Sequence, residues 1–505
     1  MDTENQNNPL SYGDQYTQYK NLPKLLKRFS FSEKMRICNE YSRKAMTFEN
    51  SRDYDKLRSM PLPWCLETFA MLSIEAYEYS DGTFLGKAEK KFAKMMYAIG
   101  SHIPESLSNC GITFADYFLP VAALTQFYLQ ESYWIKFYRY CTIFSDNSKP
   151  TLLKDIFIKK MGTSYYDYLL FGICLEIFFS IKTTIPPRII EYLLYRFSPV
   201  SNHLIIKRED YVSLQQKFIS NPSEKSEYLY SVRPSYQYSF VKYRDSIYFP
   251  LPHLLTYNIT SSLYFRMTDG DNNLRDHIGK HILERYLLNM MEQSNIYDEV
   301  FPEQLYKGQS GSEAKSPDVI ARQKDAVLFL DSKSTVPSIG IRLFDNKAYE
   351  KNIEITADNV VKLYKQIKNF SKFNPFAVAV SGAVSDYWGI VVVLEDSYIR
   401  RHKYYERVYN KLQLPEDSPE WQWITTHIKI VNLYEIERLC YCSCSIIDAL
   451  KEQEKSGQIY DYPFSGTGGK DASFTNSNLL KFKTKVLCDV DAIKDELLNE
   501  GLLSR

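Results

Sequence analysis

Residues 316–335 read SPDVIARQKDAVLFLDSKST and hold two short apolar runs separated by a polar turn. The first run follows a Pro-Asp pair that ends at Asp318, and the second run ends in Asp331-Ser332-Lys333. Two β-rich runs joined by a few turn residues predict a β-hairpin. Because side chains alternate along a strand, we expect Asp331 and Lys333 on one face and Ser332 on the other. The hairpin therefore predicts two carboxylates and an ammonium group close together.

This grouping of charges suits the hydrolysis of phosphodiester bonds. Hard divalent cations such as Mg²⁺ take oxygen ligands, usually one or two protein carboxylates together with waters and phosphate oxygens. A bound cation polarises the phosphate and lowers the pKa of a water molecule, and a nearby lysine orients or deprotonates that water. Asp318 and Asp331 are thus candidate ligands of Mg²⁺, with Mn²⁺ as an alternative ion, and Lys333 is the candidate activator of water.

Pro317-Asp318 and Asp331-Ser332-Lys333, each beside an apolar strand, resemble the motif of the PD-(D/E)xK nuclease superfamily. Many restriction endonucleases and recombination nucleases have this fold. The resemblance implies a restriction-endonuclease-like α/β core, in which a mixed sheet is flanked by helices. It also implies a metal-dependent nuclease that acts on DNA.

The same resemblance implies a third acidic ligand. Residues 274–293 carry apolar side chains at helical spacing, and Glu284 lies near the edge of that apolar face. The superfamily often takes an acidic ligand from such a preceding helix, which implies that Glu284 joins Asp318 and Asp331 around one or two Mg²⁺ ions. Glu313, on a Gly/Ser-rich loop just upstream, stays open as the alternative ligand.

Two further groups are implied at the site. The carbonyl oxygen of Ser332 is implied as an additional metal ligand. Residues 356–370 form a second predicted amphipathic helix that contains Gln366, and this amide is implied to orient the substrate or Lys333.

The segments after this helix complete the predicted core. Residues 375–380 (PFAVAV) and 389–394 (GIVVVL) are short, apolar and β-branched, which predicts buried strands. Helix, hairpin, helix and buried strand follow the order shown by the superfamily. The predicted nuclease-like core therefore covers residues 271–400.

A histidine pair offers a different metal chemistry. His277 and His281 are four residues apart, and Glu284 follows three residues later, so a helix would bring them onto adjoining faces. The order differs from the HExxH motif, because Ile278 stands where that motif has its glutamate. We therefore favour an oxygen-ligated cation.

Composition limits the function classes. The 505 residues exceed what one core supports, and 44% hydrophobic with 24% charged residues is typical of globular proteins. The net charge of +1 gives no global signature of nucleic-acid binding, so a nuclease would need a local basic face. Two candidate patches lie at 400–403 and on the second helix, and a solvated face is the simpler interpretation of each. The lysines of that helix are Lys362, Lys365, Lys368 and Lys372.

Cysteine usage and hydropathy suggest the compartment. Cys440, Cys442 and Cys444 are the only cluster, and without a partner pair they are expected to be packed thiols rather than zinc ligands. The polar N-terminus lacks the pattern of a signal peptide, and the longest apolar run, 169–181, is too short to span a membrane. The prediction is a cytoplasmic chain without a membrane partner.

The whole chain is predicted to be a multi-domain α+β protein, with an irregular all-helical N-terminal domain before the α/β core. The predicted segments are a disordered tail at 1–13, a helical domain at 14–204, a β-containing connector at 205–270, the core at 271–400, a helical and strand extension at 401–455, and a linker with a terminal helix at 456–505.

The function predicted from these observations is DNA phosphodiester hydrolysis. By analogy alone, a nuclease core with a helical domain suggests a bacterial anti-phage defence or restriction effector, whose helical domain binds a partner protein. Two alternatives stay open, namely a catalytically silent scaffold of the same fold that binds a partner, and a nuclease that acts on RNA.

Overall fold

The computed structural model describes most of the chain in detail. The described residues are 18–47, 62–78, 86–102, 131–181, 186–217, 234–308, 311–337, 341, 346–373, 386–456 and 473–503. The predictions of a disordered tail at 1–13 and a strand at 375–380 lie outside them, as does most of the linker predicted after residue 456.

The chain forms two compact units. The first comprises Met1–Gln130, Phe157–Met267 and Asp489–Arg505, and the second comprises Glu131–Ile156 and Thr268–Cys488. Residues 131–156 therefore belong with the segment predicted as the core, although they lie within the sequence range predicted as the helical domain. No helix among the described residues combines the length and the apolar composition needed to cross a bilayer.

The first unit is mainly helical, as its punctuated apolar pattern predicted. Its helices are α1 (Leu22–Leu26), α2 (Phe31–Thr47), α4 (Pro63–Glu75), α5 (Glu89–Gly100), α10 (Tyr165–Ile181), α11 (Pro187–Arg196), α12 (Ser198–Ser201), α13 (Arg208–Lys217), α14 (Leu255–Ile259) and α15 (Ser261–Thr268). A small sheet has the order β1 (Ile205–Lys207), β2 (Phe240–Tyr243), β3 (Ser246–Tyr248). All three strands lie within residues 205–270, the predicted β-containing connector.

The second unit is built on a mixed five-stranded sheet. Its order is β10 (Ile428–Asn432), β9 (Asp386–Val393), β8 (Ala326–Lys333), β7 (Val319–Gln323), β4 (Glu299–Pro302). Strands β4, β7 and β8 are antiparallel neighbours, while β8, β9 and β10 run parallel. The hairpin predicted from residues 316–335 is confirmed as β7 and β8, and the mixed α/β character of the fold is confirmed with it.

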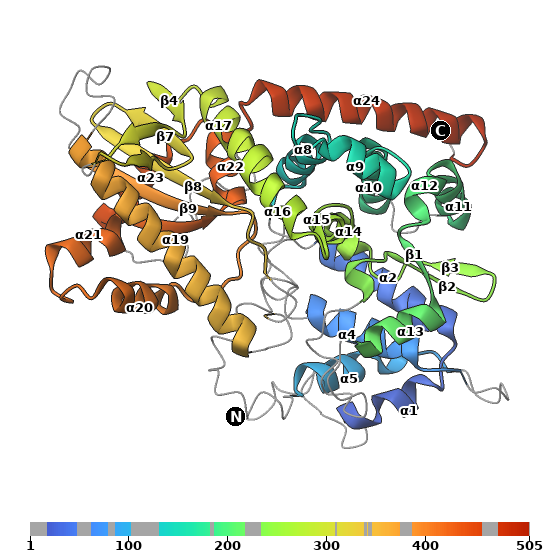
Figure 1. The fold of residues 1–505 in the computed structure, drawn as a ribbon. Coiled ribbons are helices and arrows are strands. Elements are labelled where there is room, and N and C mark those ends of the chain that lie inside the picture. The colour runs from blue at the N-terminus through green and yellow to red at the C-terminus, as the bar shows by residue number, and fades with distance from the viewer. Residues whose placement is uncertain are drawn as a thin grey trace, which may run out of the picture. The chain divides into compact units, whose positions relative to one another are not determined.

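One face of this sheet is covered by α19 (Asn346–Phe373), which Figure 1 shows lying across the strands. Val327 and Phe329 of β8 pack with the apolar side of α19 in one buried cluster. A Cβ atom on Gly389 of β9 would lie 2.7 Å from Ile367 Cδ1, so glycine permits this close contact between helix and strand. By alternation, Asp331 and Lys333 lie on the same face as Val327 and Phe329.

The helix predicted at 274–293 is present, but it is interrupted. It consists of α16 (Asn272–His277), a π-helical turn at Ile278–Leu283, and α17 (Glu284–Gln293). A Cβ atom on Gly279 would lie 2.9 Å from Ser334 Oγ, so this turn approaches the chain just after β8. Single π turns inside helices occur often at functional sites.

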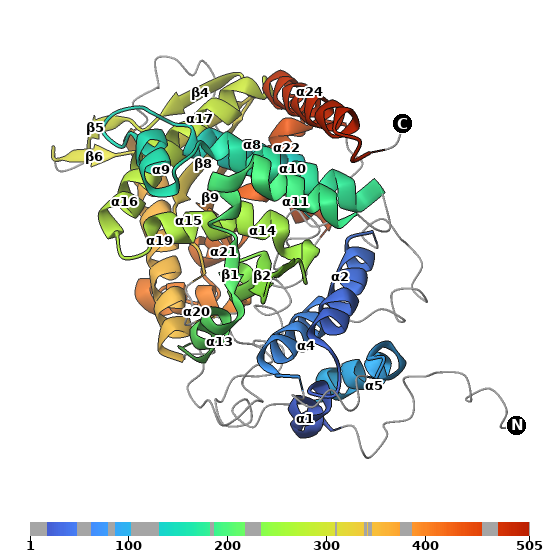
Figure 2. The ribbon, with the colours of Figure 1, turned by 90° about the vertical axis from the view of Figure 1, so that its right-hand side faces the viewer.

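The remaining elements of the second unit surround the sheet. Strands β5 (Leu305–Lys307) and β6 (Glu313–Lys315) follow β4 and precede β7 in the sequence. They pair as a two-stranded ribbon, which projects at the left edge of Figure 2. The helices are α8 (Tyr133–Phe144), α20 (Arg401–Leu412), α21 (Pro419–His427), α22 (Leu433–Tyr441) and α23 (Ile446–Ser456). Helices α9 (Leu153–Met161) and α24 (Ser477–Asn499) each have residues in both units, as does α15 through its last residue, Thr268.

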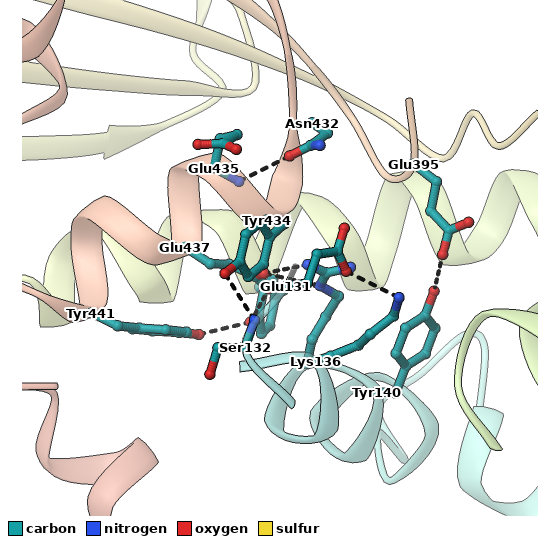
Figure 3. Close-up of polar contacts among 12 residues, drawn as sticks. Glu131, Ser132, Lys136, Tyr140, Glu395, Asn432, Tyr434, Glu435, Glu437 and Tyr441 are labelled. Atoms are coloured by element: carbon teal, nitrogen blue, oxygen red, sulfur yellow. Dashed lines mark hydrogen bonds and ion pairs between the residues drawn. The ribbon is translucent and has the colours of Figure 1, made fainter. Parts of the chain in front are cut away.

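Helix α8 is held in the second unit by polar contacts to segments far along the chain (Figure 3). The Tyr140 hydroxyl donates to Glu395 Oε1 at 2.9 Å, and the Ser132 amide donates to the Tyr434 hydroxyl at 2.8 Å. The guanidinium of Arg139 forms an ion pair with the carboxylate of Glu437, and both side chains are fully buried. These contacts explain why residues 131–156 belong to this unit.

Candidate functional site

The predicted site lies where the antiparallel pair β7 and β8 opens. The pairing of Val319 with Leu330 puts Asp318, just before β7, next to the last residues of β8. Asp318 is 8% exposed and Asp331 is completely buried. Two acidic side chains are therefore withdrawn from water at one end of the sheet, which is costly unless a cation compensates them.

Asp318 is held by the backbone and side chain of Ser332. Its Oδ2 atom accepts hydrogen bonds from the Ser332 amide at 2.7 Å and from the Ser332 hydroxyl at 3.0 Å. Burial, and then the charge of Asp331, raise the pKa of Asp318 to about 6. These two hydrogen bonds favour the ionised form but do not outweigh burial and repulsion.

Lys333 contacts two of the oxygen atoms predicted to bind metal. Its ammonium group forms an ion pair with Asp331 Oδ2 and donates to the Ser332 carbonyl oxygen at 3.2 Å. Asp331 and Lys333 are thus on the same face, as the alternation of the strand predicted. An ammonium group bound to two oxygens marks a position that favours positive charge.

Glu284 reaches this site electrostatically from the start of α17. Burial, and then the charge of Asp318, raise the pKa of Glu284 to about 7, with a smaller contribution from Asp331. Glu313, the alternative ligand, is exposed on β6 opposite Lys307. The charges of Asp318 and Asp331 thus act on Glu284, whereas Glu313 is exposed on a separate two-stranded ribbon.

Gln366 lies on α19 and contacts the chain that leads to Asp318. Its amide nitrogen donates to the carbonyl oxygens of Lys315 at 3.3 Å and Ser316 at 3.2 Å. Its Oε1 atom is buried without a hydrogen-bond partner among the described residues. Gln366 therefore positions the entry to β7 and leaves one amide oxygen available as an acceptor.

Lys362 also contacts the site, although the sequence did not predict it as a site residue. Its ammonium nitrogen lies 3.4 Å from Asp331 Oδ1, although its side chain is 54% exposed. Lys362 and Gln366 are four residues apart and so share one face of α19. That spacing was the available signal, but the sequence alone predicted a solvated lysine.

The histidine pair and the basic run at 400–403, both named from the sequence, make other contacts. The rings of His277 and His281 are 5.7 Å apart, and burial lowers the pKa of His281. Arg401, from the basic run at 400–403, is 6% exposed and forms an ion pair with Asp396. Arg407, further along α20, is paired with Glu350. Arg401 therefore cannot contribute to an exposed basic patch.

The carboxylate oxygens of the acidic residues are of the type that a hard divalent cation binds. Asp331 Oδ2 is buried and, among the described residues, accepts no hydrogen bond of ordinary geometry. Burial raises the pKa of both Glu284 and Asp318, and repulsion from Asp318 at Glu284 and from Asp331 at Asp318 raises them further. Within the described part of the chain, no three His, Cys, Asp or Glu side chains form a preformed metal-binding group. Cation binding would therefore require Lys333 and Lys362 to move away from Asp331.

The raised pKa values predict how stability depends on pH. Since the folded-state pKa of Glu284 is about 7 against an ordinary value of 4.5, its protonated form contributes stability below pH 4.5 that is lost as pH rises through 7. We expect the melting temperature of wild type, relative to Glu284→Gln, to fall over this range. Addition of Mg²⁺ should raise the melting temperature of the wild type at pH 7.5 but not at pH 5, because protons displace the cation from the carboxylates. Thermal denaturation at several pH values measures both effects, and identical pH profiles for the two proteins would contradict the prediction.

Comparisons of the chain with protein-family models, with curated proteins and with solved structures find no match. Only the geometry of this site therefore bears on the function of the protein.

Proposed function

We propose that this protein is a metal-dependent nuclease that hydrolyses phosphodiester bonds of DNA. The observation that supports it best is the end of β8, where the buried Asp331 and the Ser332 carbonyl both contact the Lys333 ammonium group. Asp318 lies across the hairpin, and the charges of both aspartates help to raise the pKa of Glu284. Packing alone does not require so many charges in a partly dry site.

The proposed roles follow from the contacts of each side chain. Asp318, Asp331 and Glu284, with the Ser332 carbonyl, would hold Mg²⁺ or Mn²⁺. When bound, such an ion polarises the phosphate and lowers the pKa of a water molecule. Lys333 orients this water for in-line attack and stabilises the charge that develops on the phosphate oxygens.

The order of elements supports a restriction-endonuclease-like core, although its sheet extends beyond the predicted residues 271–400 to β10. A helix that carries Glu284 precedes three antiparallel strands, and α19 then leads to the parallel strand β9. The resemblance of the sequence motif implies helix, hairpin, helix and buried strand, and β4 adds one antiparallel strand before the hairpin. The position of Gln366 against the chain before Asp318 agrees with its proposed role as a positioning residue.

The direct test is incubation of the purified chain with plasmid DNA and with labelled oligonucleotides. We expect cleavage in Mg²⁺ or Mn²⁺ and none in chelator. Single-stranded DNA, duplex DNA and RNA of one sequence should be compared in parallel, since preference for RNA would change the substrate assignment. Absence of metal-dependent cleavage of all these substrates would reject the proposal.

A catalytically silent, partner-binding scaffold is the second candidate. The observation that favours it is the neutralisation of Asp331 by two ammonium groups, together with the near-neutral charge of the chain. Calorimetric titration with Mg²⁺ separates the two candidates. A nuclease should bind the ion in the wild type and lose that binding in Asp318→Asn, whereas the scaffold should bind no ion in either protein.

A further inference from the structure

Lys362 differs from Lys368 and Glu354 of α19 because its ion-pair partner is a buried carboxylate. Lys368, six residues further on, is paired with the exposed Glu420 of a neighbouring helix. Glu354, eight residues before Lys362, is paired with Lys411 of α20. Lys362 instead extends from a half-exposed position to a carboxylate that is fully buried at the end of β8.

This contact contributes little to the stability of the fold. An ion pair with one half-exposed partner is weak, and the long side chain loses rotamer freedom to form it. Lys333 already neutralises the other oxygen of Asp331. Since the chain does not need a second ammonium group for structure, the position of Lys362 calls for a different explanation.

A divalent cation and Lys362 would compete for Asp331. Carboxylate oxygens that bind Mg²⁺ directly cannot keep two ammonium groups at ion-pair distance, because the like charges repel. Once displaced, the Lys362 ammonium group needs a new anionic partner at the mouth of the site. In a nuclease, the anion brought there is a phosphate, which lysine binds as a flexible point charge.

We propose that Lys362 is a substrate-binding residue whose ammonium group moves from Asp331 to a phosphate oxygen of the nucleic acid when a divalent cation binds. This inference rests on the proposed nuclease function. It assigns the ligand of Lys362 as a backbone phosphate, which carries no sequence information. It also makes binding of the cation and binding of the nucleic acid mutually favourable. The cation releases the Lys362 ammonium group for the phosphate, and the phosphate keeps that group away from the Asp331 carboxylate.

The first test is cation binding to the full chain without nucleic acid. Calorimetric titration with Mn²⁺ should show that Lys362→Gln binds the ion up to about fivefold more tightly than the wild type, because one competing charge is gone. Lys368→Gln, which removes the same charge from the same helix, should match the wild type. Weaker Mn²⁺ binding by Lys362→Gln would overturn the proposal.

The second test is the affinity for a labelled DNA duplex in chelator and in Ca²⁺, with strand integrity checked by electrophoresis. In Ca²⁺, Lys362→Gln should bind roughly tenfold more weakly than the wild type, and the slope of log affinity against log salt should be lower by about 1. Lys362→Arg should restore most of the affinity, and Lys368→Gln should leave it unchanged. In chelator, where Lys362 stays on Asp331, the wild type and Lys362→Gln should differ little.

The outcomes separate this inference from the proposed function. If the wild type binds and cleaves DNA, and Lys362→Gln keeps the affinity and salt slope of the wild type in Ca²⁺, Lys362 does not contact phosphate and the inference fails alone. If the wild type binds neither Mn²⁺ nor nucleic acid, the proposed function fails, and this inference fails with it.

Discussion

Replacement of Asp331 by asparagine should lower the rate of metal-dependent DNA cleavage by about 10³-fold or more, and Lys333→Ala should lower it by a similar factor. Asparagine keeps the shape of Asp331 and removes the charge that pairs with Lys333 and Lys362. Lys333→Ala removes the only ammonium group that contacts both Asp331 and the Ser332 carbonyl among the described residues. Initial cleavage rates at fixed Mg²⁺ concentration measure both losses.

The matched control is Asp325→Asn at the opposite end of the same hairpin. Asp325 is exposed in the turn between β7 and β8, so the same chemical change there should leave the rate within about twofold of wild type, as usual for surface substitutions. Circular dichroism and melting temperature should show all three variants folded. Cleavage close to the wild-type rate in either Asp331→Asn or Lys333→Ala would refute the assigned roles.

The local parts of the site were predictable because strand alternation and turn chemistry act over a few residues. The apolar runs around a polar turn gave β7 and β8, and Lys324 in that turn has the positive φ of 55° that a tight hairpin needs. Apolar spacing likewise gave the helix that carries Glu284. The π turn just before Glu284 was missed, because its extra residue leaves almost no mark on helical periodicity.

The long-range parts were not predictable from the same patterns. Lys362 lies 31 residues from Asp331 in sequence, and its contact depends on how α19 crosses the sheet. In the sequence it has the same appearance as Lys365 or Lys368, which are also exposed on α19. Burial of a charge depends on partners that no local pattern reveals, as Arg401 and Asp396 also show.

The position of α8 depends on contacts between residues distant in sequence, which local patterns did not predict. Arg139 and Glu437 are 298 residues apart, yet the Arg139 Nε atom donates to Glu437 Oε1 at 2.8 Å inside the second unit. In the sequence analysis, α8 fell within the N-terminal helical domain. Neither residue has a neighbour in sequence that marks it as buried, so the assignment of 131–156 to the second unit required the structure.

This buried pair predicts a large effect on stability. Arg139→Ala or Glu437→Ala should reduce the free energy of unfolding of the second unit by about 3–5 kcal/mol, because each leaves an uncompensated buried charge. Glu437 also accepts a hydrogen bond of 2.6 Å from the Tyr286 hydroxyl, and Tyr286 in turn contacts the Tyr441 hydroxyl at 2.7 Å. Figure 3 shows Glu437 and Tyr441 within this group of polar contacts. Urea denaturation of the full chain, followed by tryptophan fluorescence, measures the loss.

The control for this prediction is an exposed ion pair in the same unit. Arg407 is 41% exposed and pairs with Glu350 and Glu354, which are 51% and 41% exposed, so Arg407→Ala should cost less than about 1 kcal/mol. The double variant Arg139→Met with Glu437→Leu should recover much of the loss seen in the single variants, since it removes both charges and fills the space. A loss in Glu437→Ala no larger than that in Arg407→Ala would contradict the prediction.

The same substitution should also affect the candidate site. Because Tyr286 lies on α17 two residues after Glu284, Glu437→Ala should weaken Mg²⁺ binding, which connects the docking of α8 to the geometry of the candidate site.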